Sequence, residues 1–277
     1  MQDSASIKSM LSLNDYYRRI CFGCAAGWLN LSAEQVDECI YHDNFSALEM
    51  PFEYWNALPE SARQKLRKRF PVIHCGNLLV PGLTSLVLSA GRNIQREFVR
   101  TCSGILRNLA ADGIRYGALD FSLISVLQDE AGLKTVSDLL RQLHPVLLET
   151  GMTLLLPVRL PLPESSLKER LTAFLRAQMI SGLKFRLEIY PHEMNPDFKP
   201  EDLAGTLRLE TRSVLFCCNS DSGNRLVRAH LIPWLRYFAL NAYPGPFFFG
   251  PLSRNNRLAA IESESCSKLI EEIGKNR

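Results

Sequence analysis

The sequence has no apolar run long enough to cross a membrane, since about 20 uninterrupted apolar residues are needed. Residues 1–17 also lack the continuous apolar segment that a secretion signal requires. No Gly/Ser-rich linker and no block of charge divides the 277 residues. These absences predict a single cytoplasmic domain over 1–277, without a membrane partner, in which 1–17 form an N-terminal arm or helix and 18–273 form the body.

The sequence also lacks a strong excess of either charge. It contains 32 Lys and Arg residues against 29 Asp and Glu residues, a formal net charge of +3. The basic residues are dispersed except at 63–69, which we expect to be the solvated face of one helix. A nucleic-acid partner is not expected, because its binding surface would need a larger basic cluster.

A cysteine-rich metal site is absent as well. Cys21 and Cys24 form a CxxC, but there is no second CxxC to complete a zinc site. Residues three apart in a strand also point to opposite faces. Most of the eight cysteines lie in apolar strand-like or helix-like segments, which is typical of reduced thiols in a core.

What the sequence does contain is a regular alternation of apolar runs with amphipathic segments. Continuous apolar runs are typical of strands that are buried on both faces, and their alternation with helices predicts a parallel sheet. Eight such units predict an α/β fold, a single (β/α)8 TIM barrel of about 250 residues. The eight predicted strands are residues 20–25, 47–52, 72–80, 116–121, 153–159, 184–190, 213–218 and 246–250.

The segments between the strands have a helical period. Apolar residues recur at steps of three and four over 94–109, 133–147 and 167–179, which predicts outer helices with one face on the sheet. A capping-box pattern at Ser32 and Gln35 predicts the start of an earlier helix over 33–42.

In such a barrel, polar residues at the carboxyl ends of the strands converge on one mouth. This argument selects four candidate catalytic residues. Glu188 and His192 lie at the end of one strand, where they would bind a metal or share proton transfer, or where His192 and Glu193 would instead cap the next loop. Glu49 and Asp120 are flanked by apolar residues and would face the mouth or bond a helix N-terminus.

The same argument selects candidate ligand-binding residues. Arg159 places a permanent cation at a strand end, where it would bind a carboxylate, a phosphate or a polyol, or would pair internally with Glu188 or Asp120. The polar loop 219–225 would hold an anion at a helix N-terminus or form an ordinary turn. The full set of binding candidates is Arg159, Asn77, Trp28, Asn219, Asp221, Arg225 and Arg254.

Two short passages carry a family resemblance. The segment 44–51 (NFSALEMP) and the segment 77–82 (NLLVPG) resemble passages that follow the first helix and the third strand of xylose isomerase-like TIM barrels. The resemblance covers about residues 18–273. It implies sugar or sugar-phosphate isomerase or epimerase activity, and a divalent metal held by a Glu, an Asp, a His and a Glu on strands five to eight.

This chain departs from the implied metal site. Glu188 stands in place of the Asp of strand six, but the strand at 153–159 offers Arg159 and no carboxylate. The strand at 213–218 has no His, and the strand at 246–250 has no Glu. An arginine beside the position would also repel a divalent ion. No metal ligand and no cofactor are therefore predicted.

Three functions stay open at this point. The first is an isomerase- or epimerase-like enzyme without metal, with Glu188 as base and Arg159 stabilising an enediolate. The second is a non-catalytic barrel that binds a sugar or a small acid, with Trp28 or Phe249 stacking on it. The third is a partner-binding protein, in which the aromatic run 247–249 fills the barrel centre or meets another subunit.

Overall fold

The computed structural model describes residues 21–25, 45–80, 82–164, 166–190, 193, 199–202, 205–217, 228–241, 243, 245–250 and 268. Within these residues, eight parallel strands pair in chain order and close into a barrel, with β1 paired to β8. The predicted (β/α)8 barrel is therefore confirmed. The predictions for 1–17 and for a helix over 33–42 lie outside the described residues.

The strands lie close to where the apolar runs predicted them. Their bounds are β1 Cys21–Ala25, β2 Ala47–Pro51, β3 Val72–Asn77, β4 Tyr116–Ala118, β5 Thr153–Leu160, β6 Leu183–Ile189, β7 Thr211–Cys217 and β8 Pro246–Gly250. The largest difference is that β3 and β4 end three residues earlier than predicted. One more backbone hydrogen bond follows each end, from the Leu78 amide to the Ala118 carbonyl and from the Leu119 amide to the Leu155 carbonyl, and the chain then leads into the next helices.

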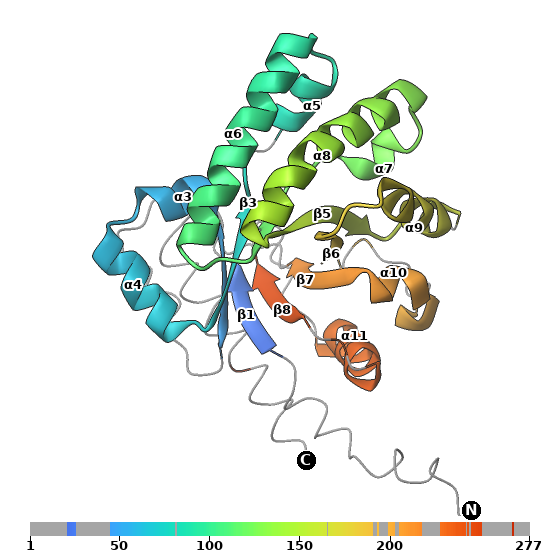
Figure 1. Ribbon diagram of the computed structural model, residues 1–277. Helices are drawn as coiled ribbons and strands as arrows, with labels where there is room; N and C mark the ends of the chain where they lie inside the picture. The colour runs from blue at the N-terminus through green and yellow to red at the C-terminus, as the bar shows by residue number, and fades with distance from the viewer. Residues whose placement is uncertain are drawn as a thin grey trace, which may run out of the picture.

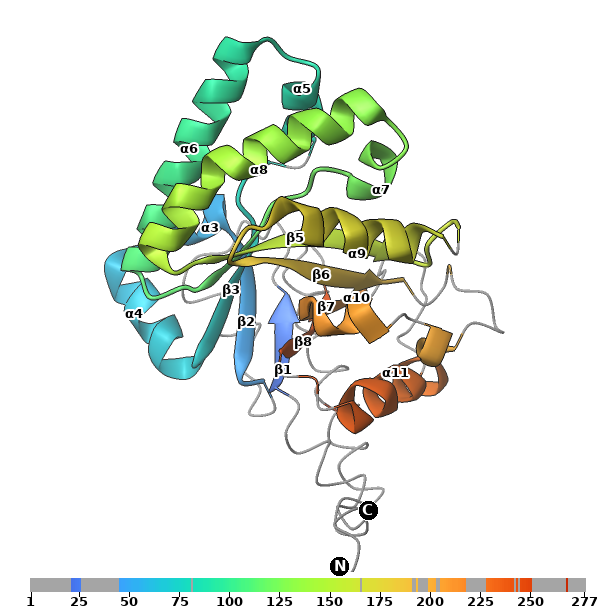
Figure 2. The ribbon, with the colours of Figure 1, turned by 45° about the vertical axis from the view of Figure 1, so that its right-hand side comes forward.

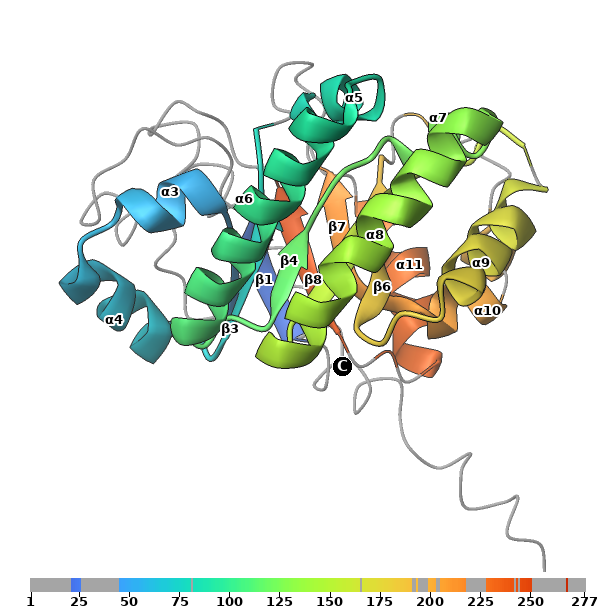
Figure 3. The same ribbon diagram turned by 45° about the horizontal axis from the view of Figure 1, so that its top comes forward.

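Helices surround the strands, as Figure 1 and Figure 3 show. Their bounds are α3 Phe52–Ala57, α4 Glu60–Arg69, α5 Leu83–Leu88, α6 Arg92–Ala111, α7 Leu123–Val126, α8 Glu130–Thr150, α9 Leu167–Gln178, the 3-10 turn η3 Pro200–Asp202, α10 Gly205–Leu209 and α11 Arg228–Leu240. In the described part of the chain, none of the helices has the length and apolar character that a bilayer span needs.

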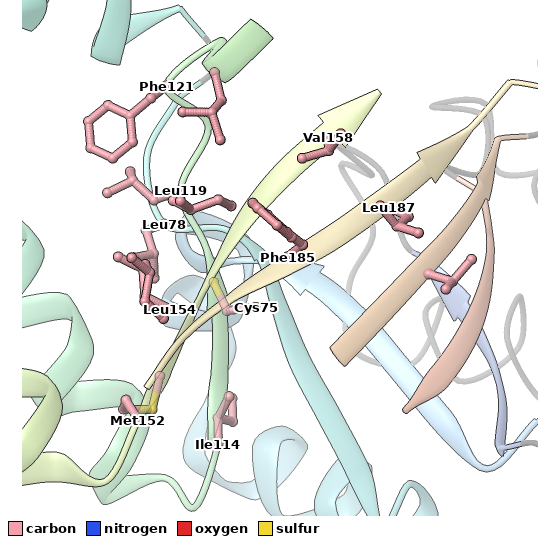
Figure 4. Packing of buried hydrophobic residues seen from close by; sticks show 14 of the residues in the cluster. Cys75, Leu78, Ile114, Leu119, Phe121, Met152, Leu154, Val158, Phe185 and Leu187 are labelled. Carbon is pink, nitrogen blue, oxygen red and sulfur yellow. The ribbon is translucent and has the colours of Figure 1, made fainter. Parts of the chain in front are cut away.

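The outer core lies between the strands and this helical layer. On α6, Phe98, Cys102 and Leu106 are buried at helical spacing, as the period predicted. Ile94 is the exception: it is 57% exposed, because the first turn of α6 is not covered by the sheet. Figure 4 shows the strand side of this core, where Leu154 and Phe185 project from β5 and β6. This packing fixes the strand directions and therefore the positions of the strand ends.

The inner core is aromatic, and the run 247–249 supplies part of it. All three phenylalanines are fully buried. Phe247 and Phe249 point outward, where Phe22 lies 6.5 Å and 6.0 Å from their ring centroids. Phe248 points into the barrel, where its ring lies 5.2 Å from that of His74. Phe248 therefore fills the barrel centre while Phe247 and Phe249 pack in the outer core, and the buried run supplies no surface for another subunit.

His74, Tyr116 and Phe248 together form what we call the barrel floor. The His74 ring stacks on that of Tyr116 at 4.4 Å and is 1% exposed. Gly23 on β1 makes room for Phe248, because a Cβ at Gly23 would lie 2.5 Å from the Phe248 ring and 2.7 Å from the Ala47 Cβ. The floor closes the interior below the strand ends.

The basic segment 63–69 forms part of α4 and is only partly solvated. Arg63 and Arg67 donate hydrogen bonds to the carboxylate of Asp112, which also accepts from Trp55 Nε1 at 2.8 Å. Asp112 follows the last residue of α6. The two arginines therefore fasten α4 to the end of α6, which corrects the expectation of a purely solvated basic face.

Substituting Gly23 by alanine is expected to destabilise the protein by about 1–3 kcal/mol, because the new methyl group overpacks the barrel interior against Phe248. Gly104→Ala is the matched control: nothing lies within 4 Å of a Cβ there, and the site is in α6. That change should stabilise the protein by about 0.5–1 kcal/mol. Urea unfolding measures both, and equal effects would contradict the packing argument.

Acid should weaken the fold through His74. Burial, with a smaller contribution from the positive charge of Arg186, lowers the pKa of His74 from 6.5 to about 3. Below pH 6.5 the unfolded chain therefore binds a proton that the folded protein does not. Stability falls as the pH drops through this window, by about 2 kcal/mol at pH 5 for this group alone.

His74→Phe should remove this part of the acid sensitivity. The test compares urea unfolding at pH 7.5 and pH 5 for the parent, His74→Phe and the control His144→Gln on α8. The control should lose as much stability as the parent. If His74→Phe also loses as much, His74 is not the group that titrates.

Candidate functional site

A cavity of about 240 Å³ opens at the carboxyl ends of the strands. Its walls include the last residues of β1, β2, β3 and β4, so it lies at the mouth of the barrel, above the floor. Leu119, Leu215 and Tyr190 contribute apolar surface. The polar residues around it are Glu49, Asn77, Thr84, Asp120, Arg186 and Glu188.

An ion pair crosses the barrel at the base of this cavity. Arg186 Nη2 on β6 donates to Glu49 Oε1 on β2 at 2.6 Å, and the side chains are only 5% and 4% exposed. Arg186 Nη1 also donates to the carbonyl of Gly76 at 3.2 Å. Gly76 is required here, because a Cβ would lie 2.9 Å from the Glu49 side chain. Glu49 therefore bonds a cation from the opposite side of the barrel and no helix N-terminus.

Glu188 extends this pair toward the mouth. It lies two residues after Arg186 on β6, so both side chains face the interior. Glu188 Oε1 is 3.0 Å from Arg186 Nη1, and the Glu188 side chain is 19% exposed. The three residues thus form a line of alternating charge, in which Glu188 is the exposed end.

Electrostatics in this line are dominated by burial. Loss of water raises the pKa of Glu49, the positive charge of Arg186 opposes that rise, and the negative charge of Glu188 adds to it. Glu49 Oε2 is buried and has no hydrogen-bond partner among the described residues. One guanidinium therefore faces two carboxylates that compete for it.

Asp120 and Asn77 lie on the rim of the cavity. Asp120 Oδ1 accepts a hydrogen bond from the Ser122 backbone amide at 2.7 Å, just before α7. Its backbone carbonyl accepts from the buried Thr84 hydroxyl. Asn77 is the last residue of β3 and also lines the cavity. Asp120 thus lines the mouth and also bonds the amide of the N-cap residue of α7, so both alternatives expected for it are found.

Arg159 is placed differently from the other candidates. It lies outside the set of residues that line the cavity, with its side chain 54% exposed. Its guanidinium donates to the carboxylate of Glu193 and lies 4.1 Å from the Tyr190 ring centroid. Of the internal partners expected for Arg159, neither Glu188 nor Asp120 is the one found. The structure pairs it with a residue in the loop after β6.

Six further candidates fall outside the described residues, and their positions are therefore predictions from the sequence only. They are Trp28, His192, Asn219, Asp221, Arg225 and Arg254.

The sequence analysis missed Arg186, the cation at the centre of the site. A signal was present in the strand: Lys184, Arg186 and Glu188 alternate with apolar residues over Leu183–Ile189. In a strand that is buried on both faces, charged residues at every second position mark the face that turns toward other charges. Glu188 lies nearer the carboxyl end of the strand than Arg186, so a prediction from strand ends includes Glu188 and leaves out Arg186.

The described residues at the mouth do not fit the divalent metal that the sequence resemblance implies. The inward-facing positions at the ends of β5 to β8 are Arg159, Glu188, Cys217 and Gly250, as the pairing registers show. Glu188 supplies the oxygen donor of this set, and it is paired with Arg186. No group of three metal-ligating side chains occurs within the described ranges. A guanidinium so close to Glu188 would also repel a divalent ion.

No model of a known protein family matches the chain, and no curated protein matches it in sequence. Solved structures do resemble it. The 3-keto-D-glucoside 4-epimerase YcjR from E. coli has a TM-score of 0.65 at 14% identity, covering 90% of this chain and 98% of that one.

Two further structures support the same conclusion. D-psicose 3-epimerase from Clostridium cellulolyticum H10, solved with D-tagatose, has a TM-score of 0.65 at 11% identity, covering 91% of this chain and 98% of that one. A xylose isomerase domain protein from Alicyclobacillus acidocaldarius has a TM-score of 0.56 at 16% identity, covering 90% and 98%. At these identities the likeness establishes the fold, and it confirms the fold that the sequence resemblance implied. The chain therefore has the fold of the xylose isomerase-like TIM barrels.

Proposed function

We propose that this protein is a sugar isomerase- or epimerase-like enzyme that holds a small sugar in the mouth cavity and moves a proton with Glu188 without a divalent metal. The observation that carries the proposal is the partly exposed carboxylate of Glu188, 3.0 Å from the Arg186 guanidinium at the base of the cavity. A base beside a fixed cation is the pair that carbon acid chemistry requires.

The size and walls of the cavity support a small polar ligand. At about 240 Å³ it is smaller than the roughly 300–1,000 Å³ of pockets for drug-sized molecules. Carboxylate and amide groups around it accept and donate hydrogen bonds, as hydroxyl groups require. Solved structures of the same fold include a D-psicose 3-epimerase and a 3-keto-D-glucoside 4-epimerase, and such enzymes were solved with D-tagatose and in the presence of D-fructose.

In the proposed reaction, Glu188 takes the proton from the carbon next to a sugar carbonyl. The electron pair of that C–H bond forms the enediolate, and the negative charge moves to the carbonyl oxygen. The Arg186 guanidinium stabilises that oxygen, which is the role we assigned to Arg159 from the sequence. The hydroxyl proton of the carbon that lost its hydrogen then passes to the former carbonyl oxygen, which leaves the new carbonyl on that carbon. Return of the proton from Glu188 to the former carbonyl carbon completes the isomerisation.

Binding without turnover is a second candidate, and one observation favours it. Arg186 Nη1 and Nη2 already bond the Gly76 carbonyl and two carboxylates, and Nε, which has no partner among the described residues, is buried, so little hydrogen-bonding capacity faces a substrate oxygen. A barrel of this kind would hold a sugar and release it unchanged. A measurement of turnover distinguishes the enzyme from the binding protein, because only the enzyme converts the bound sugar.

The proposal places the enzyme in the cytoplasm, acting on a small molecule with no nucleic-acid partner. The described cysteines, among them Cys75 and Cys102, are thiols outside any disulfide, which fits a reducing compartment.

Turnover should depend on Glu188 and not on metal. In a panel of ketohexoses that includes D-tagatose, D-psicose and D-fructose, Glu188→Gln should lower kcat at least about 100-fold, because the amide cannot accept the proton. A chelator should leave the parent activity unchanged. Glu149→Gln is the control, since that residue pairs with Arg107 on the outer helices. Loss of activity on chelation would overturn the metal-free reaction.

The cross-barrel pair should also be needed for stability. Arg186→Met leaves the Glu49 carboxylate buried without its cation, which should cost about 3–5 kcal/mol in urea unfolding. The double variant Glu49→Gln/Arg186→Met buries no uncompensated charge and should recover about 2 kcal/mol or more of this loss. A cost below about 1 kcal/mol for the single variant would mean that the pair does not hold the barrel together.

A further inference from the structure

The described charges around the cavity do not balance. Glu49, Asp120 and Glu188 bring three carboxylates to its walls, and Arg186 brings the one described guanidinium. Arg159 lies near the mouth, but its charge is matched by Glu193. The cavity therefore has an excess of negative charge from the described residues.

The excess is not balanced by other charges among the described residues of the cavity. Both terminal nitrogens of Arg186 are engaged, one by Glu49 and one by Glu188 and the Gly76 carbonyl. Glu49 lines the cavity and is 3% exposed, yet its Oε2 has no hydrogen-bond donor among the described residues. A buried carboxylate oxygen without a donor is costly, so it points to a donor that arrives with the ligand.

The side chains that face the cavity decide which kind of cation it can bind. A divalent metal needs several ligands at short, fixed distances, and the described residues offer no such group. An ammonium group carries three N–H donors on a single charge and accepts looser geometry. It would add the missing positive charge beside Glu188 and Asp120 without displacing Arg186.

We propose that the ligand of this cavity is an amino sugar, bound through its positively charged amine at the carboxylates of the mouth. This inference rests on the proposed function, and it specifies the substrate class. The described charges disfavour sugar phosphates and sugar acids, whose negative groups would face the carboxylates of Glu188 and Asp120. The proposed ligand is therefore an amino sugar and not the sugar acid that the sequence analysis left open.

The test measures binding of matched sugars by isothermal titration calorimetry at pH 6.5. The probes are glucose, mannose and galactose, their 2-amino-2-deoxy forms, the corresponding N-acetyl forms and the 6-phosphates. The N-acetyl group keeps the nitrogen and removes its charge. At least one amine should bind ten times or more tightly than its parent sugar, a difference of about 1.4 kcal/mol. The N-acetyl form and the phosphate should lose this gain.

A variant of the rim checks the cause of the preference. Asp120→Asn keeps an oxygen that accepts from the Ser122 amide and removes the charge, so the fold is retained. It should reduce the preference for the amine at least threefold, and added salt should reduce it in the parent. Glu149→Gln is again the matched control and should leave the preference unchanged.

The outcomes separate the two proposals. Equal binding of amine and parent sugar would overturn the amino-sugar inference and leave a neutral-sugar enzyme in place. Tighter binding of the phosphates would overturn it as well. If no sugar in this panel binds but a ketohexose is turned over, the amino-sugar inference alone is wrong. If no sugar binds and no ketohexose is turned over, the proposed sugar function itself is wrong.

Discussion

The ion pair between Glu49 and Arg186 is the interaction on which the interior of this barrel depends. It joins β2 to β6 across the centre, where both side chains are almost fully buried. A carboxylate and a guanidinium are tolerated there because each compensates the other, and removal of one leaves a buried charge. The absence of a side chain at Gly76 makes room for Glu49, and the Gly76 carbonyl takes part of the guanidinium. Aromatic packing closes the interior below the pair, and Glu188 continues it above.

This arrangement also shows how the mouth of this barrel differs from the divalent-metal site that the sequence resemblance implies. A guanidinium is a cation that the chain supplies itself, and it is held by carboxylates in the way that a metal would be. Because the guanidinium belongs to Arg186 on β6, its position is set by the register of that strand, and it does not exchange with solvent as a bound ion does. Arg186 is thus a fixed cation among the carboxylates at the base of the mouth, while the inward-facing positions at the ends of β7 and β8 are Cys217 and Gly250.

Much of the fold was predictable, because strand burial and helix period are local properties of the sequence. Eight apolar runs became the eight strands, and the run at 247–249 had to place Phe248 opposite to its neighbours. The ends of β3 and β4 were less predictable. The residues that follow stay apolar because they are buried in the core, as Phe121 is against Phe98 of α6, so composition does not reveal where hydrogen bonding to the next strand stops.

For the site, the sequence predicted which residues lie at the strand ends but not how they pair. Glu49, Asn77, Asp120 and Glu188 were expected at the mouth and line the cavity there. The pairings were not predictable, since Glu49 and Arg186 are 137 residues apart and Arg159 meets a partner in a loop.

That separation has a consequence for how the chain folds. Glu49 lies in the first quarter of the sequence, and its ion pair with Arg186 forms only when β6 joins the sheet. Ordering so long a loop costs entropy before the contact can form. A chain that has assembled β1 to β4 therefore holds Glu49 without its partner, so the first half of the barrel has to stay open to water until the second half arrives.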